Sequence, residues 1–461
     1  MAGIAGIDRA GSRDLVARML EKMAYRGQGG SKLIEGNNAT LGAVWPGTQA
    51  TPTSSILKEQ AVWDARHPPM PGALGWEREP FALAVAMPPG LFMARSPLGV
   101  RPLYYGQTDD GAICFASEVK ALLVATRDVH EFPPGFWYSS QAGLQTFYKF
   151  EPQIALDLEP DVIASGLRLG LEQAVRRRVD SDVMGCWLSG GLDSSVMAAL
   201  ARPHVRKLYT FAGGVSGAPD LDFARHVADF LGTEHHEIVV TPGELLAALP
   251  EVVYHLESFD ALLVRSTVVN YLVSQHAANY AGVVLSGEGG DELFAGYHYL
   301  KELEPGQLDQ ELMDIVQRLH NTALQRVDRS ASAHGLVAHV PFLDLDVVEY
   351  AQSIPPQLKL WRNGEMIEKW ILRQAMVGAL PEEVLWRNKA KFWKGAGVGD
   401  LLARYADERI GDAEFNRERT LPNGWALNTK EELMYYRIFR EHFGDVRDLS
   451  WMGRTKGAPK T

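Results

Sequence analysis

At 461 residues the chain is long enough for more than one hydrophobic core, so two domains are the expected organisation. Its 46 basic and 57 acidic side chains give a net charge of −11, which disfavours a nucleic-acid partner. The only two cysteines, Cys114 and Cys186, exclude a disulfide framework and favour a reducing, cytoplasmic location. We expect no signal peptide and no membrane span, because the start lacks a basic region before a long apolar run and residues 81–94 are interrupted by Pro88-Pro89-Gly90.

Residues 1–150 are expected to form a mainly β domain. Short apolar segments such as FALAVAM, GLFMARS, PLYYG and ICFAS are separated by Gly, Pro and Asp turns, which is typical of antiparallel sheet. The segment 47–75 is rich in Pro, Thr and Ser, and we expect it to be loop or a shortened region.

The period changes near Leu158, and residues 155–450 are predicted to form a second domain of alternating helices and strands. A helix over 161–179 ends in three arginines that complement its dipole. This order predicts a parallel sheet with crossover helices. Residues from Leu312 onward favour helix, and residues 451–461 are expected to be a flexible tail. Strands are predicted over 183–188, 207–212, 236–240 and 282–285, and helices from Ser194 and over 221–231 and 243–255.

A strand that ends in a Gly- and Ser-rich loop and enters a helix suits a phosphate group. Glycine lets the backbone approach an anion, the helix N-terminus presents unpaired N–H groups, and serine hydroxyls add donors. The loop lacks the lysine and the spacing of a Walker A loop, so transfer of the γ-phosphate is not indicated. The predicted pyrophosphate loop comprises Leu188, Ser189, Gly190, Gly191, Asp193, Ser194 and Ser195.

A second acidic cluster, LSGEGGDE, follows another predicted parallel strand. Carboxylates at the carboxyl ends of neighbouring strands face one crevice, so we expect Asp193 and Asp291 to bind Mg²⁺ and Gly287 to lie at the nucleotide. Glu288 is a candidate for substrate binding, with helix N-terminal stabilisation as the alternative. Lys369, four residues before Arg373 on one helical face, points at phosphate or at acidic neighbours.

The loop SGGLDSS resembles the pyrophosphate loop of the asparagine synthetase and β-lactam synthetase family, which splits ATP to AMP and pyrophosphate. Similar stretches run along nearly the whole chain: MAGIAGI, RSPLGVRPLYYG, FASEVKALL, LGTEHHE, LSGEGGDELFAGY, HVPFLD, EKWILRQAM, LPEEVLWRNKAKF and KEELMYYRIF. The resemblance implies an α/β protein: an N-terminal glutaminase-like (Ntn-type) αββα domain and a C-terminal ATP-pyrophosphatase domain, a doubly wound parallel sheet with a helical extension. It also implies ATP and Mg²⁺ as cofactors, a homodimer, and Lys389 as the lysine that stabilises developing charge.

The chain departs from this family at the glutaminase nucleophile. Glutamine-using members have a cysteine at position 2, whereas this chain has Ala2, and a methyl group cannot attack a carboxamide. The Asn-Gly-Glu stretch that holds glutamine is absent as well. The amine is therefore expected to be free ammonia or another amine, or to be part of the substrate as in β-lactam synthetase.

Two further departures concern the acid substrate. Val337-Ala338-His339 stands where asparagine synthetases have Glu-Ala-Arg, so the base has changed, and His339 is a candidate for it. Leu262 and Leu263 replace two threonines, which suits a less polar acid, while Arg265 remains as a carboxylate binder.

These features predict an AMP-forming ATP-dependent amide ligase that joins a small carboxylic acid other than aspartate to an amine that glutamine hydrolysis does not supply. The alternatives are an ammonia-dependent asparagine synthetase, an intramolecular cyclase and a non-catalytic ATP-binding regulator. RNA chemistry on the same loop is disfavoured because no basic RNA-binding domain and no CxxC pair are present.

Overall fold

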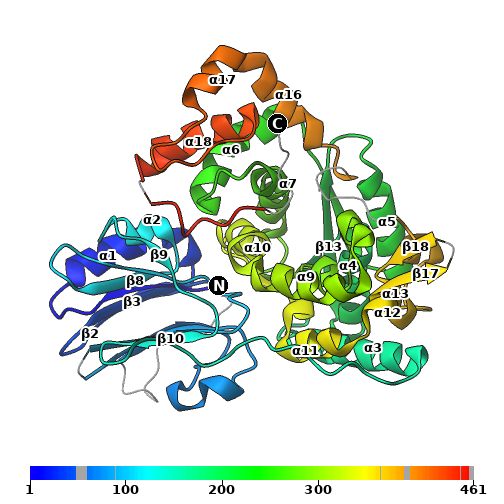
Figure 1. Ribbon diagram of the computed structural model, residues 1–461, viewed down its shortest axis with the longest axis horizontal. Coiled ribbons are helices and arrows are strands. Elements are labelled where there is room, and N and C mark those ends of the chain that lie inside the picture. Colours follow the sequence, from blue (N-terminus) through cyan, green and yellow to red (C-terminus); the bar gives the residue numbers. More distant parts are fainter. Residues whose placement is uncertain (48–59, 89, 364, 389–394, 447, 456–461) are drawn as a thin grey trace.

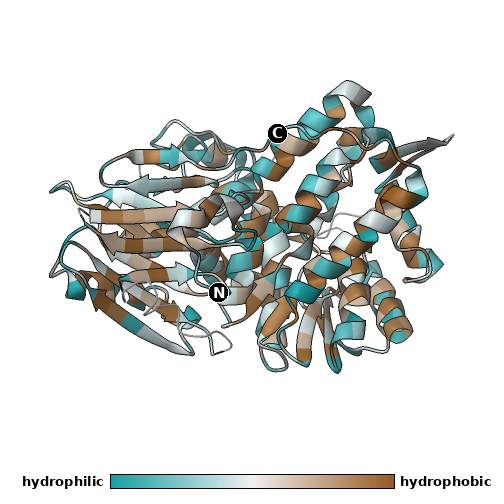
Figure 2. Ribbon diagram, turned by 90° about the horizontal axis from the view of Figure 1, so that it is seen from below, coloured by the Kyte–Doolittle hydropathy of each residue, from teal (hydrophilic) through white to brown (hydrophobic). Residues whose placement is uncertain are grey.

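The computed structural model describes residues 1–47, 60–88, 90–363, 365–388, 395–446 and 448–455. The N-terminal domain lies on the left of Figure 1, in blue and cyan, and the C-terminal domain lies on the right. In Figure 2 the strands are mostly brown, whereas the peripheral helices mix brown and teal along their length. The apolar side chains therefore gather between the layers of each domain. None of the described helices is long and apolar enough to cross a bilayer.

Two stacked antiparallel sheets form the N-terminal domain, as the turn-rich pattern predicts. Residues of α1 (Arg13–Glu21), including Val16, Met19 and Leu20, are buried on one sheet. The first sheet has the order β2 (Gly30–Glu35), β3 (Thr40–Trp45), β1 (Gly3–Ile7), β8 (Ile113–Ala116), β7 (Tyr104–Gln107) and β9 (His130–Glu131), and α2 (Val119–Leu122) follows β8. The second has the order β11 (Gly143–Thr146), β10 (Phe136–Ser139), β6 (Gly90–Arg95), β5 (Ala82–Met87) and β4 (Ala61–Asp64).

The two sheets stack as expected for a glutaminase-like (Ntn-type) domain, and the outer face of the second sheet has only a short cover in the described part of the chain. Among the described residues this face is covered by a 3₁₀ segment, Pro71–Trp76, whose Leu74 packs with Trp63 and Phe81. The segment 47–75 is also not wholly loop, because it contains strand β4. Four residues of strand are too short to show a clear alternation, and β4 is recognisable only by its pairing with β5.

The C-terminal domain is built on the predicted parallel sheet, and all four strand pairs are parallel. The order is β14 (Glu234–Val239), β13 (Lys207–Gly214), β12 (Val183–Trp187), β15 (Val283–Leu285) and β16 (Val337–His339). Strand β16 was not predicted, since its three residues lie in a region with a helical pattern. The chain moves outward from β12 to β14 and then returns to the other side of β12 at β15. A topological switch point therefore lies between β12 and β15.

Helices cover both faces of this sheet and extend beyond it, and their positions agree with the predicted ones within a few residues (Figure 1). A short hairpin of β17 (Leu360–Asn363) and β18 (Glu365–Glu368) precedes α13. The helices are α3 (Pro160–Arg177), α4 (Leu192–Ala201), α5 (Pro219–Leu231), α6 (Pro242–Leu256), α7 (Ala261–Ala277), α8 (Gly290–Leu293), α9 (Pro305–Gln317), α10 (Ala323–Ser332), α11 (Leu345–Ser353), α12 (Pro356–Lys359), α13 (Trp370–Ala375), α14 (Glu382–Leu385), α16 (Gly399–Arg409), α17 (Asp412–Glu418) and α18 (Lys430–Phe443).

The first five residues of the predicted flexible tail, 451–455, pack against the rest of the structure. Trp451 and Met452 are buried, and the Trp451 ring meets the Tyr104 ring of the N-terminal domain edge to face at 6.2 Å. Thr455 donates from its N–H and its hydroxyl to Asp260 at 3.0 and 2.8 Å. Residues 451–455 thus join the two domains, and residues 456–461 lie outside the described part.

The two domains meet through buried ion pairs. The guanidinium of Arg329 on α10 contacts Asp328 at 2.7 Å, Glu257 at 3.0 Å and Glu118 of the N-terminal domain at 3.5 Å. Arg26 of the N-terminal domain pairs with Glu118 and with Asp328 of the C-terminal domain. All five side chains are at most 2% exposed. The stability of the interface therefore requires all of these acidic and basic side chains, because removing one leaves its buried partners without a counter-charge.

Acid is expected to weaken this interface. Glu131 lies 2.8 Å from Arg95 and 2.6 Å from His320 of the C-terminal domain; although burial opposes it, these two groups lower its pKa from 4.5 to about 2. A carboxyl whose folded pKa is depressed stabilises the fold above its unfolded pKa, and this contribution is lost as pH falls. Urea unfolding between pH 4.5 and pH 2 should show a loss of up to about 3 kcal/mol from this group. In Glu131→Gln the free energy of unfolding should depend less steeply on pH over this range. An equally steep pH dependence in this variant would contradict the prediction.

Candidate active site

Two adjoining crevices open at the carboxyl ends of β12, β13 and β15, at the switch point of the sheet. They share Ser189, Asp193 and Ser194, so they form the two halves of one site. The first is also lined by Gly191, Leu192, Asp220, Lys369, Arg373, Arg387 and Asn388. The second is also lined by Trp187, Leu188, Phe211, Ala212, Gly213, Asn270, Val273, Ser286, Gly287, Glu288, Gly289, Asp291, Glu292 and Arg326.

The predicted pyrophosphate loop forms the floor between the crevices. Gly190 has φ +70°, and a Cβ there would lie 2.6 Å from the Ala224 backbone nitrogen, so only glycine fits this turn. The Ser194 hydroxyl accepts from the Ser189 N–H at 3.1 Å, and the Ser195 hydroxyl donates to the Gly191 carbonyl at 2.8 Å. Helix α4 begins at Leu192 with Gly191 as its N-cap, and its first N–H groups are presented to the crevice.

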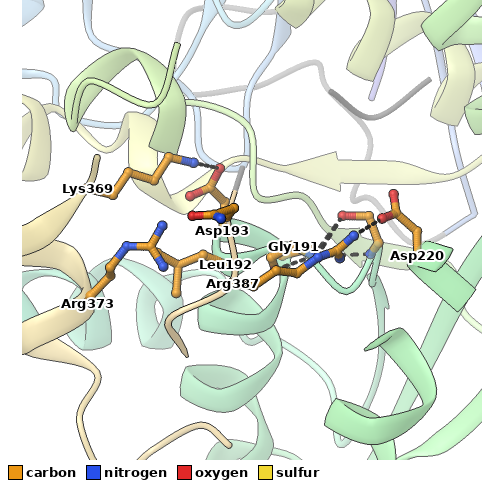
Figure 3. Close-up of a pocket in the computed structure, with 10 residues that line it drawn as sticks. Gly191, Leu192, Asp193, Asp220, Lys369, Arg373 and Arg387 are labelled. Atoms are coloured by element: carbon orange, nitrogen blue, oxygen red, sulfur yellow. Dashed lines mark hydrogen bonds and ion pairs between the residues drawn. The ribbon is translucent and has the colours of Figure 1, made fainter. Parts of the chain in front are cut away.

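Lys369 lies between the two predicted metal-binding carboxylates. Its ammonium nitrogen is 2.6 Å from Asp193 and 2.5 Å from Asp291, as Figure 3 shows for Asp193. The side chain is 2% exposed, and the residue has φ +58°, a costly conformation for a non-glycine residue. Three segments distant in sequence thus place one cation between two acids above the pyrophosphate loop.

The second loop touches the first through Gly287. A Cβ on Gly287 would lie 2.7 Å from the carbonyl carbon of Asp193 and from the Ser194 nitrogen, which are backbone atoms and cannot move away easily. Gly287 therefore allows the loops after β12 and β15 to meet at the switch point.

Gly287→Ala is expected to weaken ATP binding about tenfold or more, because overpacking of about 1–3 kcal/mol would displace the pyrophosphate loop. Fluorescence titration with a labelled ATP analogue would measure the loss. Gly170→Ala is the matched control, since a Cβ on this α3 glycine meets nothing within 4 Å. Unchanged affinity in Gly287→Ala would contradict the close approach.

Arg387 and Asp220 were not predicted to belong to the site, yet both line it. Arg387 donates to Asp220 at 2.6 Å, as Figure 3 shows, and to the carbonyl of Gly190 at 3.0 Å. Its guanidinium also lies over the Phe223 ring. Arg387 is part of the WRNKAKF stretch, two residues before Lys389, and Asp220 opens the helix after β13. Both could have been found from those positions, since the carboxyl ends of adjacent strands share a crevice.

Acidic side chains line the second crevice. Glu288 forms a salt bridge with Arg326, and Glu292 accepts a hydrogen bond from Tyr297. Burial, with the charges of Glu288 and Asp291, raises the pKa of Glu292 to about 8. Two buried donors of this crevice, Trp187 Nε1 and Asn270 Nδ2, have no acceptor among the described residues. They are available to a bound molecule.

Asp193 and Asp291 also fit a magnesium ion. The ammonium of Lys369 lies between them, which shows that their geometry accommodates a cation. Mg²⁺ is usually held by one or two carboxylates together with substrate phosphates rather than by a full protein cage. Accordingly, no group of three or more metal-binding side chains occurs among the described residues.

Comparison with known proteins assigns the chain to a family. The model described as asparagine synthase matches residues 166–314 and 303–457, and the glutamine amidotransferase domain matches residues 80–150. The chain belongs to the asparagine synthase family. Its matched region contains both loops of the crevice and Lys369.

Relatives in this family include glutamine-hydrolysing asparagine synthetases. Asparagine synthetase 2 of Arabidopsis thaliana is 38% identical over 76% of this chain and 64% of its own length. Asparagine synthetase B of Escherichia coli is 36% identical over 79% of this chain and 69% of its own length. The chain thus spans about two thirds of the length of these relatives. Among solved structures, an NH3-dependent NAD synthetase from Campylobacter jejuni is 14% identical, and the match covers 62% of this chain and 95% of the synthetase. Its TM-score is 0.28, so the family assignment does not rest on it.

The three residues that stand at family positions for the acid are not brought to the crevice. Arg265 forms a bidentate salt bridge with Glu431 of α18. Together with Leu262 and Leu263 it lies in the first turns of α7. The residues of α7 that line the crevice, Asn270 and Val273, lie further along the helix. Among the described residues, the lining of the two crevices does not include Leu262, Leu263 or Arg265.

Val337 and His339 lie on β16, outside both crevices as described. Val337 pairs in register with Val283 at the amino end of β15, whereas the crevice opens at the carboxyl ends. His339 is buried, and its pKa is held well below the usual value by that burial and by the charges of Arg101 and Arg178. It therefore lies toward arginines at the domain interface rather than above the nucleotide loop. Lys389 lies outside the described residues.

Proposed function

We propose that this protein is an ATP-dependent, AMP- and pyrophosphate-forming amide ligase. The observation that carries the proposal is the position of Lys369 between Asp193 and Asp291 above the pyrophosphate loop. ATP and Mg²⁺ are its cofactors. The apolar wall of Phe211, Ala212 and Val273 suits a planar base, and Trp187 Nε1 and Asn270 Nδ2 offer donors to its polar atoms or to the ribose.

In the first step the carboxylate oxygen of the acid attacks the α-phosphorus of ATP. The bond from that phosphorus to the bridging oxygen breaks, pyrophosphate leaves, and an acyl-adenylate forms. Gly191 and the first turn of α4 present N–H groups to the departing pyrophosphate, while Lys369, Arg373 and Arg387 place positive charge around it. Mg²⁺ bound by Asp193 and Asp291 would neutralise part of the same charge.

In the second step an amine attacks the acyl carbon, AMP leaves, and the amine loses one proton. The replacement of the family glutamate by Val337 does not deprive the crevice of carboxylates, because Glu288 lines it beside Arg326. Glu288 is our candidate for the proton acceptor.

The amine is proposed not to come from glutamine. Ala2 stands where glutamine-hydrolysing relatives need a thiol. It lies fully buried just before β1, and its N–H donates to Asp64 at 3.0 Å. We expect no glutamate release when the protein is incubated with glutamine, with or without Mg-ATP. Glutamate formed at a rate that matches AMP formation would refute this part of the proposal and leave the ligase reaction intact.

We base the choice of candidate acids on the residues that line the crevice, not on Leu262, Leu263 and Val337. Since Leu262, Leu263 and Val337 do not line the crevice as described, an acid other than aspartate keeps only the support of the family departures. Aspartate therefore belongs in the substrate panel beside less polar acids. A cytoplasmic homodimer remains our proposal as well, supported by two buried free cysteines and the family resemblance.

The test is incubation with Mg-ATP and a panel of carboxylic acids, with and without ammonia, hydroxylamine or hydrazine, followed by mass spectrometry of AMP, ADP and pyrophosphate. We expect equal amounts of AMP and pyrophosphate with one acid. Amide formation without added amine would identify an intramolecular cyclase. Tight ATP binding without pyrophosphate under every condition would favour a non-catalytic regulator and overturn the proposal.

A further inference from the structure

A second cavity lies behind the nucleotide site, on the far side of α8. It measures about 60 Å³, enough for a small molecule or several waters. Its walls come from α8, α9, α11, α12 and the segment between the two domains, represented by Pro152 and Gln153. It shares only Glu292 with the crevices described above.

Lys359 is the central feature of this cavity. Its side chain is 3% exposed, and its ammonium makes no hydrogen bond and no salt bridge with any residue that the structure describes. Burial lowers the pKa of Lys359 to about 8, and the charge of Asp309, which also lines the cavity, opposes this shift only in part. Since the enclosed side chain disfavours the charged form of Lys359, a ligand that supplies an anionic group to its ammonium would stabilise that charge.

Other polar groups of the cavity also lack partners. The side-chain amide of Gln352 on α11 is buried at both its nitrogen and its oxygen, and neither atom has a hydrogen-bond partner within the described chain. Oε2 of Glu292 is also buried and has no hydrogen-bond partner within the described chain, whereas Oε1 accepts a hydrogen bond from Tyr297. Asp309 on α9 is exposed at the mouth of the cavity, although desolvation by its neighbours raises its pKa. Donors and acceptors are therefore both available on the cavity wall.

We propose that this cavity binds a small amino acid or a molecule of similar chemistry, with a carboxylate and an ammonium or amide group. The carboxylate accepts from Lys359 and from the Gln352 nitrogen, and the donor group faces Asp309 and the Gln352 oxygen. A simple anion would leave the buried Gln352 oxygen without a donor, and a simple cation would meet the ammonium of Lys359.

The site is distinct from the one that binds the nucleotide, although both adjoin α8. Asp291 lines the nucleotide crevice, whereas the next residues, Glu292 and Leu293, line the cavity. A bound amino acid would contact the same short helix that carries a proposed magnesium ligand. We therefore expect occupancy of the cavity to change the KM for ATP while the nucleotide remains in its own crevice.

The binding test uses the full-length protein without nucleotide and four probes: glycine, L-aspartate, succinate and ethylamine. Titration calorimetry should show saturable binding of at least one amino acid, weaker binding of succinate, and none of ethylamine. Lys359→Met should weaken amino-acid binding about tenfold or more, because a charge-assisted hydrogen bond is lost. Asp309→Asn should weaken binding of the amino acid but not of succinate, and Asp309 does not line the nucleotide crevice.

Thermal melting separates a binding lysine from a structural one. Lys359→Met should raise the Tm of the ligand-free protein, because an apolar side chain replaces an unpaired buried charge. Lys207→Met, at an exposed lysine paired with Glu234, is the control and should leave amino-acid binding unchanged. The proposal is overturned if no probe binds the wild-type protein, if Lys359→Met binds equally well, or if Lys359→Met melts lower. Should that variant not fold, the Asp309→Asn titration decides.

Discussion

Lys369→Met is expected to reduce ATP-dependent pyrophosphate release about 10²–10³-fold, the usual effect of removing one group that stabilises developing charge in an enclosed site. The ammonium lies 2.6 Å from Asp193 and 2.5 Å from Asp291, and both carboxylates are mostly buried. Without it, Asp193 and Asp291 would keep only the proposed Mg²⁺ to offset their charge, and they would repel the phosphates more strongly. Steady-state pyrophosphate release with the acid identified by the substrate panel would measure the change.

Lys301→Met is the matched control for this prediction. Lys301 also forms a salt bridge of 2.7 Å, with Glu368, the residue before Lys369, but it does not line either crevice as described. We expect this variant to retain most of its activity. If both variants lost activity equally, the effect would come from the local structure around β18, and the assignment of Lys369 to the nucleotide site would be wrong.

Arg329→Met is expected to lower the free energy of unfolding by about 3–5 kcal/mol, which is the cost of leaving buried acids without their partner. Arg329 contacts Asp328 and Glu257 and also donates to the carbonyl of Ser117 in the N-terminal domain at 3.2 Å. Because the lost contacts with Ser117 and Glu118 cross the domain interface, thermal unfolding should separate into two transitions, one for each domain. Calorimetry and urea titration would measure both effects.

Arg318→Met provides the comparison. Arg318 is a mostly exposed arginine paired with Asp314 in the last turn of α9, so its replacement should change stability by no more than about 0.5 kcal/mol. A single transition and a small loss in Arg329→Met would show that the domains are held together mainly by apolar contacts, such as that of Trp451 with Tyr104.

The interface bears on the proposed loss of glutaminase activity. A domain without the nucleophile would still be needed if its surface completes the fold of its neighbour. Here Glu118 of the N-terminal domain lies among arginines that also neutralise Asp328 and Glu257 of the C-terminal domain. Removing the N-terminal domain would take Arg26 away from Asp328 and Glu118 away from Arg329, and would expose the remaining C-terminal charges to solvent. Retention of the domain therefore has a structural explanation that does not require glutamine hydrolysis.

The sequence by itself determined the features that depend on local pattern. The parallel strands β12 to β15 and their helices follow from hydrophobic period and turn residues. The turn proposed to bind pyrophosphate follows from Gly190, Gly191 and the serines in one contiguous run. These signals are contained within a few residues of each other. The family resemblance rests on the same contiguous stretches, which explains why it agreed with the comparisons.

The tertiary structure alone decided which distant residues meet. Arg265 is suited to a substrate carboxylate by its chemistry, but Glu431 binds it instead. The sequence left two possible partners for the Lys369 side chain, a phosphate or acidic neighbours. Its position between Asp193 and Asp291 follows only from the packing of α13 near two strand ends. Strand β16 and the cavity around Lys359 likewise depend on contacts between segments far apart in the chain. Periodicity reports which face of an element is buried, but not what that face is buried against.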